Sequence, residues 1–321
     1  MGLTGLSFAW RFAARTWGLP PEIGQIIGIV AIAAFLALTV AYIIKLIRFP
    51  QTVRSEFDHP VSVSFFGAVL ISLLLLPGVI RQYNLVLAEW VWGVGAILMF
   101  LFAWLVLRKW LDKQQDPGNA MPAWIIPIVG TLDVPIIGTQ LPIPGVHEIC
   151  LVFYGIGIIF AIIILTIIIS RLFFQPPLPE ALQPTLLILV GPFAVAFSGY
   201  EGLTGHQDMI ASIFYYFDLF ILLLFGSKIF LLPRCCPFRV TWWAVSFPMV
   251  AITIAAFRYA EFNEAPVFKV IAGVLLSVSS FVILYLFIQT FYKIFTGTLF
   301  LVNAAAEKAT AQLHEPSNAG K

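Results

Sequence analysis

Charged residues are scarce in this sequence. Aspartate, glutamate, lysine and arginine make up 11% of its 321 residues and hydrophobic residues 60%, whereas a soluble domain usually carries about 25% charged residues. The chain therefore lacks the polar surface of a water-exposed globule, and its net charge of +2 offers no basic stripe to a nucleic acid. Its apolar runs are about 20 residues long without period-two alternation, which favours helices that span a lipid bilayer over a β-barrel.

Residues that support catalysis or hold metals and cofactors are also few. Three cysteines provide no disulfide framework, and four histidines fall near the ends of the predicted spans or in loops, where they do not suit a haem-binding membrane subunit. The residues concerned are Cys150, Cys235, Cys236, His59, His147, His206 and His314. The sequence has no metal-ligand spacing and no glycine-rich phosphate loop. We therefore expect no enzyme, no ATP-driven pump, no metal and no cofactor.

Hydropathy predicts ten membrane-spanning helices. They cover approximately residues 2–17, 23–47, 61–80, 85–107, 121–139, 147–170, 183–200, 210–232, 240–260 and 267–296. The N-terminal stretch lacks a basic region ahead of its apolar residues, so we expect it to be the first span and not a cleavable signal peptide. The predicted layout is a transmembrane domain of residues 1–302 followed by a polar cytoplasmic tail of residues 303–321.

The distribution of positive charge predicts the orientation of these spans. Most lysines and arginines fall on the side that holds the C-terminal tail and the loops after the even-numbered spans. The other side holds only Arg11, Arg15, Arg81, Arg258 and Lys269. The positive-inside rule then places both termini in the cytoplasm, in the plasma membrane or the inner membrane of the cell.

Proline and glycine alternate along the predicted spans. The odd-numbered spans contain or adjoin Gly2, Gly5, Gly67, Pro77, Pro127, Pro135, Pro184, Pro192 and Pro248, whereas the even-numbered spans contain no proline. A helix break in lipid is tolerated where neighbouring helices or a water-filled cavity satisfy the freed backbone groups. The pattern predicts five helical hairpins, each with a bent inner helix and a straight outer helix, and the inner helices surround a central pore. The alternative is that prolines bend buried helices in a solid transporter core.

Several residues of the odd-numbered spans are candidates for the lining of this pore. They are Ser64, Phe65, Ser72, Thr131, Asp133, Pro192, Ser246, Pro248 and Thr253. Hydroxyl groups hold ions weakly, as conduction requires, although each serine or threonine could instead form a hydrogen bond between helices. Asp133 is interpreted as the only acid well within a span, and a structural role beside Pro135 is favoured for it over a role in transport.

Phe247 directly precedes Pro248 in the ninth span. Proline disfavours the helical conformation of the residue before it, and a large ring at a helix break can close a narrow pore by its bulk and by excluding water. Phe247 is therefore a candidate gate, with simple packing in the interior as the alternative.

Five segments resemble one family of membrane proteins. The run from Trp242 to Met249 closely resembles the ninth-helix signature of the tellurite-resistance/dicarboxylate transporter family, which includes the plant slow-type anion channels and the TehA proteins. The segments at 5–10, 59–66, 127–138 and 184–192 are similar to its first, third, fifth and seventh helices. The resemblance implies ten helices in five hairpins, a homotrimer with one pore in each protomer, and a phenylalanine that occludes the pore at the position of Phe247.

Two transport functions follow from these features. The first is an anion channel for small anions such as chloride or nitrate. The second is a secondary transporter or exporter of C4-dicarboxylates such as malate, of sulfite or of tellurite-related oxyanions, in which Asp133 is the candidate for a proton site. A membrane-embedded redox subunit is a third possibility, and it requires a bound chromophore or metal.

Overall fold

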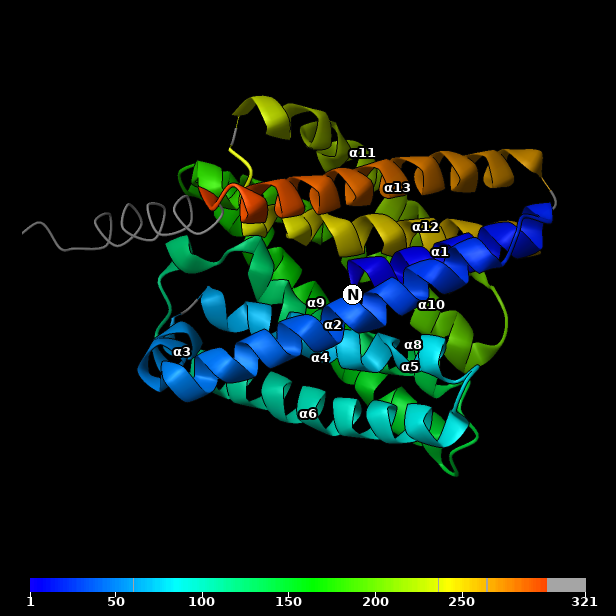
Figure 1. Ribbon diagram of the computed structural model, residues 1–321, viewed down its shortest axis with the longest axis horizontal. Helices are drawn as coiled ribbons and strands as arrows, with labels where there is room; N and C mark the ends of the chain where they lie inside the picture. Colours follow the sequence, from blue (N-terminus) through cyan, green and yellow to red (C-terminus); the bar gives the residue numbers. More distant parts are fainter. Residues whose placement is uncertain (60, 236, 264, 299–321) are drawn as a thin grey trace, which may run out of the picture.

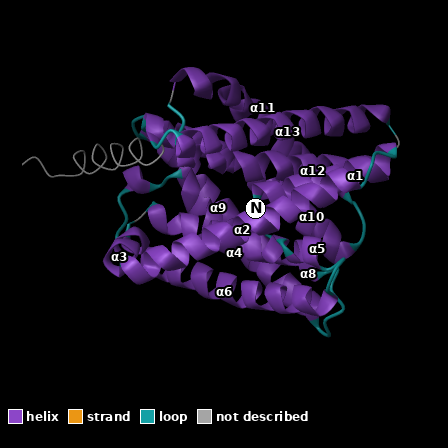
Figure 2. Ribbon diagram, in the orientation of Figure 1, coloured by secondary structure: helices purple, strands orange, loops and turns teal. Residues whose placement is uncertain are grey.

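The computed structural model describes residues 1–298 apart from 60, 236 and 264, with only the backbone of residues 228–235. Every regular element in this part of the chain is helical (Figures 1 and 2). The α-helices are α1 (Gly2–Trp17), α2 (Glu22–Arg48), α3 (Pro50–Asp58), α4 (Ser62–Leu75), α5 (Pro77–Ile80), α6 (Leu85–Leu111), α7 (Ile126–Leu132), α8 (Val134–Gly138), α9 (Val146–Phe174), α10 (Gly191–Thr204), α11 (Met209–Cys235), α12 (Ser246–Phe262) and α13 (Pro266–Phe295). Four 3₁₀-helices are η1 (Pro117–Asn119), η2 (Pro122–Ile125), η3 (Glu180–Val190) and η4 (Val240–Val245).

Eight helical segments are long and apolar enough to cross a membrane, which makes the chain an all-helical polytopic membrane protein. The eight are Glu22–Arg48, Ser62–Ile80, Leu85–Leu111, Val146–Phe174, Glu180–Thr204, Met209–Ser227, Val240–Phe262 and Pro266–Phe295. They coincide with eight of the ten predicted spans. The other two predicted spans correspond to α1, with 16 residues, and to the shorter apolar segment Pro122–Gly138. The count of ten spans therefore stays a prediction, as does the tail at 303–321, which lies outside the described residues.

Prolines mark the places where helical segments begin anew. Pro77, Pro127, Pro135, Pro192 and Pro248 lie in the first turns of α5, α7, α8, α10 and α12. Because proline has no N–H group and its ring collides with the carbonyl four residues earlier, it fits the first turn of a helix and not the interior. In the predicted fifth, seventh and ninth spans a 3₁₀ segment precedes the α-helix, so each of these spans changes its helix type along its length, and we call such spans discontinuous.

Burial separates the spans into two groups. The three long spans that the sequence analysis predicted to be bent, Ser62–Ile80, Glu180–Thr204 and Val240–Phe262, are 61–83% buried, and the five other long spans are 11–39% buried. The difference has a physical cause, because the backbone groups freed at a helix break find no hydrogen-bond partner in lipid. The discontinuous spans are therefore covered by the continuous ones.

Consecutive helices of the chain pack against one another. α1 contacts α2, α4 contacts α6, α7 contacts α9, α10 contacts α11, and α12 contacts α13. Figure 1 shows α6 along one edge of the molecule and α11 and α13 along the opposite edge, with α12 and α1 on the inner side of α13. α1 also packs against α12, where Gly5 lies so close to the Val250 side chain that any larger residue would collide with it. This approach brings the first and ninth predicted spans together in the middle of the molecule.

Candidate functional site

One cavity is lined by residues of α1, α4, α5, α8, α10 and α12 or of the turns next to them. It encloses about 720 Å³ of space, part of it open to solvent. Among the described residues, its lining comes from the five predicted odd-numbered spans and their flanking turns and includes no residue of the long helices α2, α6, α9, α11 and α13. The cavity therefore occupies the space between the most buried segments of the chain.

Most of the residues that line the cavity recur three or four positions apart along their segments and form stripes. On α12 the stripe consists of Phe247, Ala251, Ile254 and Arg258. Such spacing places side chains on one face of an α-helix. At a rise of 1.5 Å per residue, the eleven positions from Phe247 to Arg258 extend over ~16 Å. The α12 stripe thus has a bulky apolar ring at one end and a cation at the other.

The stripes of the neighbouring segments have the same polarity. The α1 stripe consists of Gly5, Phe8, Phe12 and Arg15, with Arg11 beside them. The second stripe runs along α4, α5 and the following turn and consists of Leu75, Gly78 and Arg81. The third runs along α8 and its flanks and consists of Asp133, Ile136, Ile137 and Gln140. In each case the residue with the highest number is polar or charged and the residues before it are largely apolar. Arginines and a glutamine thereby gather at one end of the cavity, which we call the mouth, and we call the opposite end the floor.

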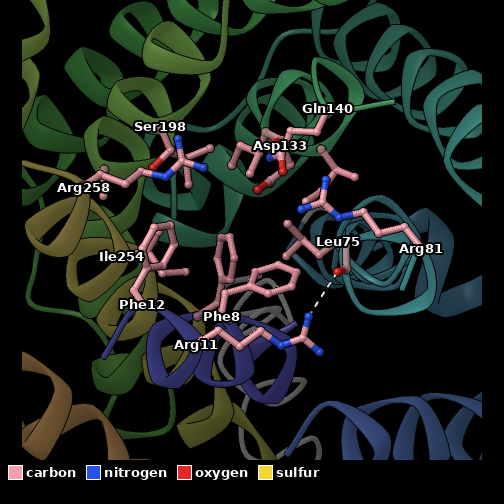
Figure 3. A pocket seen from close by; sticks show the side chains of 18 of the residues that line it. Phe8, Arg11, Phe12, Leu75, Arg81, Asp133, Gln140, Ser198, Ile254 and Arg258 are labelled. Atoms are coloured by element: carbon pink, nitrogen blue, oxygen red, sulfur yellow. Dashed lines mark hydrogen bonds between the residues drawn. The ribbon is translucent and has the colours of Figure 1, made fainter. Parts of the chain in front are cut away.

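Arginines dominate the mouth (Figure 3). Arg258 Nη1 donates a hydrogen bond to Glu201 Oε2 at 2.7 Å, so its charge is paired across α12 and α10. The Arg15 and Arg258 guanidinium carbons lie 4.9 Å and 5.6 Å from the centre of the Phe12 ring, within the range of cation–π attraction. Arg11 makes one long hydrogen bond, from Nη1 to the Gly78 carbonyl at 3.4 Å.

Phe247 and Asp133 lie toward the floor. The Phe247 side chain is 8% exposed, and the residue stands in the first turn of α12, directly after the 3₁₀ segment η4. Asp133 lies at the junction of α7 and α8 and is fully buried, and neither of its carboxyl oxygens has a hydrogen-bond partner among the described residues. The structure therefore brings the predicted gate and the predicted intramembrane acid to the same cavity.

The other predicted pore-lining residues do not line this cavity. They are Ser64, Phe65, Ser72, Thr131, Pro192, Ser246, Pro248 and Thr253. Ser72, Thr131, Ser246 and Thr253 each donate a hydrogen bond of 2.7–2.8 Å to a carbonyl oxygen three or four residues earlier. Their hydroxyls thus bond to their own helices, and their contribution to a pore stays a prediction.

The sequence analysis missed a second buried acid. It interpreted Asp133 as the only acid well within a span, yet Asp218 on α11 is also fully buried. The Asp218 carboxyl faces the backbone N–H groups of Phe193 and Ala194, in the first turn of α10, without a hydrogen bond of ordinary geometry. A carboxylate at this place complements the positive end of the α10 dipole. Its position in the middle of the predicted span 210–232 was the available signal.

The mouth arginines were also interpreted differently at the sequence level. The sequence analysis assigned Arg11 and Arg258 to the outer side of the membrane and gave them no role in a pore. The stripe spacing that ends at Arg15, Arg81 and Arg258 was the signal that links them to one cavity.

The fold and the cavity define a polytopic helical membrane protein with a cation-lined opening between its discontinuous helices. The chain belongs to the family described as "SLAC1: Voltage-dependent anion channel", whose profile matches residues 1–291. This membership confirms the family resemblance of the sequence analysis, and it places the chain among anion channels and transporters and not among enzymes.

Similar proteins occur in plants and bacteria. The chain is 26% identical to the "S-type anion channel SLAH3" of Arabidopsis thaliana over 92% of its own length and 47% of that protein's length. It is 26% identical to the "Tellurite resistance protein TehA homolog" of Haemophilus influenzae over 94% of its own length and 90% of that protein's length. The "Guard cell S-type anion channel SLAC1" of Arabidopsis is 22% identical, with 94% and 55% covered. The chain therefore spans about half the length of these Arabidopsis relatives.

Proposed function

We propose that this protein is an anion-selective channel that passes small anions, chloride and nitrate among them, through a pore within each protomer that Phe247 closes. One observation carries the proposal. The cavity is bounded by the five discontinuous or glycine-rich inner segments, has arginines at its mouth, and leads past Ala251 and Ile254 to the ring of Phe247. The membership of the SLAC1 family and the names of the plant relatives support the same function.

The chemistry of the cavity wall supports conduction over tight binding. Between the mouth and Phe247 the α12 and α1 stripes present Ala251, Ile254, Phe8 and Gly5, which offer an anion no fixed partner. An ion that is held weakly leaves quickly, as conduction requires. α12 begins within the membrane span, and the partial positive charge of its first turn, beside Phe247, favours negative charge there.

The gate is tested by removing the Phe247 ring. We expect Phe247→Ala to raise the chloride conductance by about tenfold or more, which corresponds to a barrier lowered by about 1.4 kcal/mol. Phe262→Ala is the matched control, because Phe262 lies on the same helix, is 51% exposed and lines no part of the cavity. Planar-bilayer recordings of both purified variants give the comparison. If a well-folded Phe247→Ala variant and the wild type have equal conductance, Phe247 is not the gate.

The orientation and the assembly are proposed on the sequence evidence. We propose that both termini lie in the cytoplasm, in the plasma or inner membrane, and that the mouth faces outward. With the native cysteines replaced by serine, an impermeant thiol reagent should label Leu19→Cys in intact cells and should not label Gln114→Cys; both positions are exposed in loops on opposite sides of the predicted membrane. The resemblance further implies a homotrimer, which light scattering of the detergent-solubilised protein tests directly.

A second function is favoured by one specific observation at Asp133. Its buried carboxyl has no hydrogen-bond partner among the described residues, and it lines the cavity. A protonatable group at such a place suits a coupled carrier of C4-dicarboxylates, sulfite or tellurite-related oxyanions. Flux into proteoliposomes across a pH gradient separates the two functions, because a carrier accumulates its substrate uphill and a channel does not. Asp133→Asn should abolish uphill accumulation if the carrier function is correct.

A further inference from the structure

The charges at the mouth of the cavity are distributed unevenly. Figure 3 shows Arg258 on one side of the cavity and Arg11 and Arg81 on another, near Leu75. The acids of this region lie with Arg258, because Glu201 on α10 pairs with it and Glu261 on α12 is close enough to interact with both Arg258 and Arg15. Positive charge is therefore balanced on the α10–α12 side of the mouth.

Arg11 and Arg81 have no such balance. Within residues 1–298, as far as they are described, neither arginine forms an ion pair, and the Arg81 side chain makes no hydrogen bond. The Nε and Nη2 atoms of Arg11 are buried and also lack a hydrogen-bond partner there. A buried guanidinium N–H group without an acceptor destabilises the folded protein. Arg11 Nη2 lies close to Gly28 of α2, and an anion between Arg11 and Arg81 would supply acceptors on the side of the Arg11 guanidinium group that faces the cavity.

The two guanidinium groups also repel each other. Arg11 and Arg81 are near enough for the charge of one to act on the other, and Arg15 adds to this field from the rim. A guanidinium group offers parallel N–H donors that match the spacing of two oxygens on one carboxylate, sulfate or phosphate. Two such groups that face one opening therefore suit an oxyanion with two negative charges better than they suit chloride, which has one charge and no oxygen pair.

We propose that Arg11 and Arg81 form an anion-binding site at the mouth, which binds tetrahedral dianions in preference to chloride and, when a dianion occupies it, obstructs the entry of chloride. The site rests on the proposed function of the cavity as an anion pathway. When no dianion is bound, the same charges raise the local concentration of chloride at the entrance. The ligand chemistry is that of sulfate or of a phosphate dianion.

The first test is block of chloride current by sulfate. Sulfate added on the mouth side of a bilayer, at constant ionic strength maintained with gluconate, should reduce the chloride current of the wild type. Arg11→Gln and Arg81→Gln should each raise the half-blocking sulfate concentration by about tenfold, the loss expected when a charge-assisted hydrogen-bond pair is removed. Arg81→Lys keeps the charge and loses the parallel donors, so its half-blocking concentration should lie between those of the wild type and Arg81→Gln.

The matched control is Lys269→Gln, which removes one positive charge on the same side of the protein from an exposed residue outside the cavity. It should leave the sulfate block unchanged. An equal loss of block in Lys269→Gln and Arg81→Gln would mean that sulfate senses only the general surface charge, and the site would then be refuted.

The second test does not depend on conduction. Sulfate should raise the melting temperature of the wild type in phosphate-free detergent solution without added lipid, and the rise should be lost in Arg11→Gln and Arg81→Gln. The absence of lipid distinguishes a soluble dianion from a lipid phosphate. If the wild type passes no chloride and sulfate still stabilises it through these arginines, the proposed channel function is wrong and the proposed anion-binding site is supported. If chloride passes and sulfate neither blocks nor stabilises, the site is overturned and the channel function stands.

Discussion

Arg258 of α12 and Glu201 of α10 form an ion pair of 2.7 Å in which the two side chains are only 13% and 12% exposed. Gln207 Nε2 donates to the Arg258 carbonyl at 3.0 Å, and the guanidinium lies near the Phe12 ring. The pair therefore joins three inner helices at the mouth of the cavity. Because both charges are largely removed from water, loss of one partner leaves the other uncompensated.

Separating this pair should destabilise the protein. Arg258→Ala and Glu201→Ala should each lower the free energy of unfolding by about 3 kcal/mol. The double variant should lose less than the sum of the two, because the second change removes a charge that the first had already left alone. Thermal unfolding in detergent measures all four proteins of the cycle. Strict additivity of the two single changes would mean that the pair contributes no coupling.

A hydrogen-bond link between α12 and α13 gives the second prediction. Thr253 Oγ1 lies 2.8 Å from Ser279 Oγ and donates to the Met249 carbonyl at 2.7 Å, and Ser279 Oγ donates to the same carbonyl at 3.0 Å. Thr253→Val should lower stability by about 0.6–1 kcal/mol, the usual value for such a bond within a membrane. The chloride conductance should not change, because Thr253 does not line the cavity. A clear change of ion selectivity in a stable Thr253→Val protein would mean that Thr253 lines the pore.

The buried carboxyl of Asp218 gives the third prediction. Since it faces the first-turn N–H groups of α10, Asp218→Ala should destabilise the protein by about 1 kcal/mol, as the loss of a helix N-terminal cap does. Asp112→Ala is the control, because Asp112 is an exposed acid at the end of α6. Melting temperatures of the two variants in detergent give the comparison. Equal melting temperatures would show that Asp218 does not stabilise α10.

The loop between α10 and α11 gives a pH-dependent prediction. The Tyr200 hydroxyl donates to Asp208 Oδ2 at 2.6 Å, and the backbone N–H groups of Ile210 and Ala211 donate to Oδ1. These hydrogen bonds, that from Tyr200 first, lower the pKa of Asp208 below its ordinary value of 3.8. The stabilisation is therefore fully present above the unfolded-state pKa and is lost as the pH falls through the lower folded-state pKa.

Removal of the Tyr200 hydroxyl should weaken this pH dependence. Tyr200→Phe should be less stable than the wild type near pH 7, and the difference should shrink as the pH falls below about 4, where Asp208 becomes protonated in both states. Melting temperatures measured across this pH range give the result. A difference that stays constant with pH would mean that the hydrogen bond does not act through the charge of Asp208.

The sequence predicted the positions of the spans better than the directions of their side chains. Hydropathy located the eight long spans because a membrane helix is continuous and apolar. Pro77, Pro192 and Pro248 were predicted to break helices, and in the structure each lies in the first turn of a new helical segment, the place in a helix that suits proline. The rotation of a helix about its axis leaves little trace in a span that is apolar all round. Thr131 and Thr253 were therefore predicted at the cavity, although their hydroxyls bond to their own helices.

The residues that form the mouth of the cavity could be identified only from the tertiary structure. Arg11 and Arg81 lie on separate spans, and Arg258 is far from both along the chain. No local sequence pattern therefore indicates that the three side chains line the same opening. Phe247 and Asp133 were found because each is unusual at its own position, one before a proline and the other charged within an apolar run. Asp218 is equally unusual, and it was missed because it belongs to a span that was interpreted as peripheral.

The most direct test of the proposed anion pathway is the reversal potential of Phe247→Ala in a planar bilayer with unequal KCl concentrations on the two sides. We predict an enlarged current that reverses close to the equilibrium potential of chloride, since anions enter past the mouth arginines and no ring then closes the path. A reversal near the equilibrium potential of potassium, or no current from folded protein, would contradict an anion pore that passes Phe247.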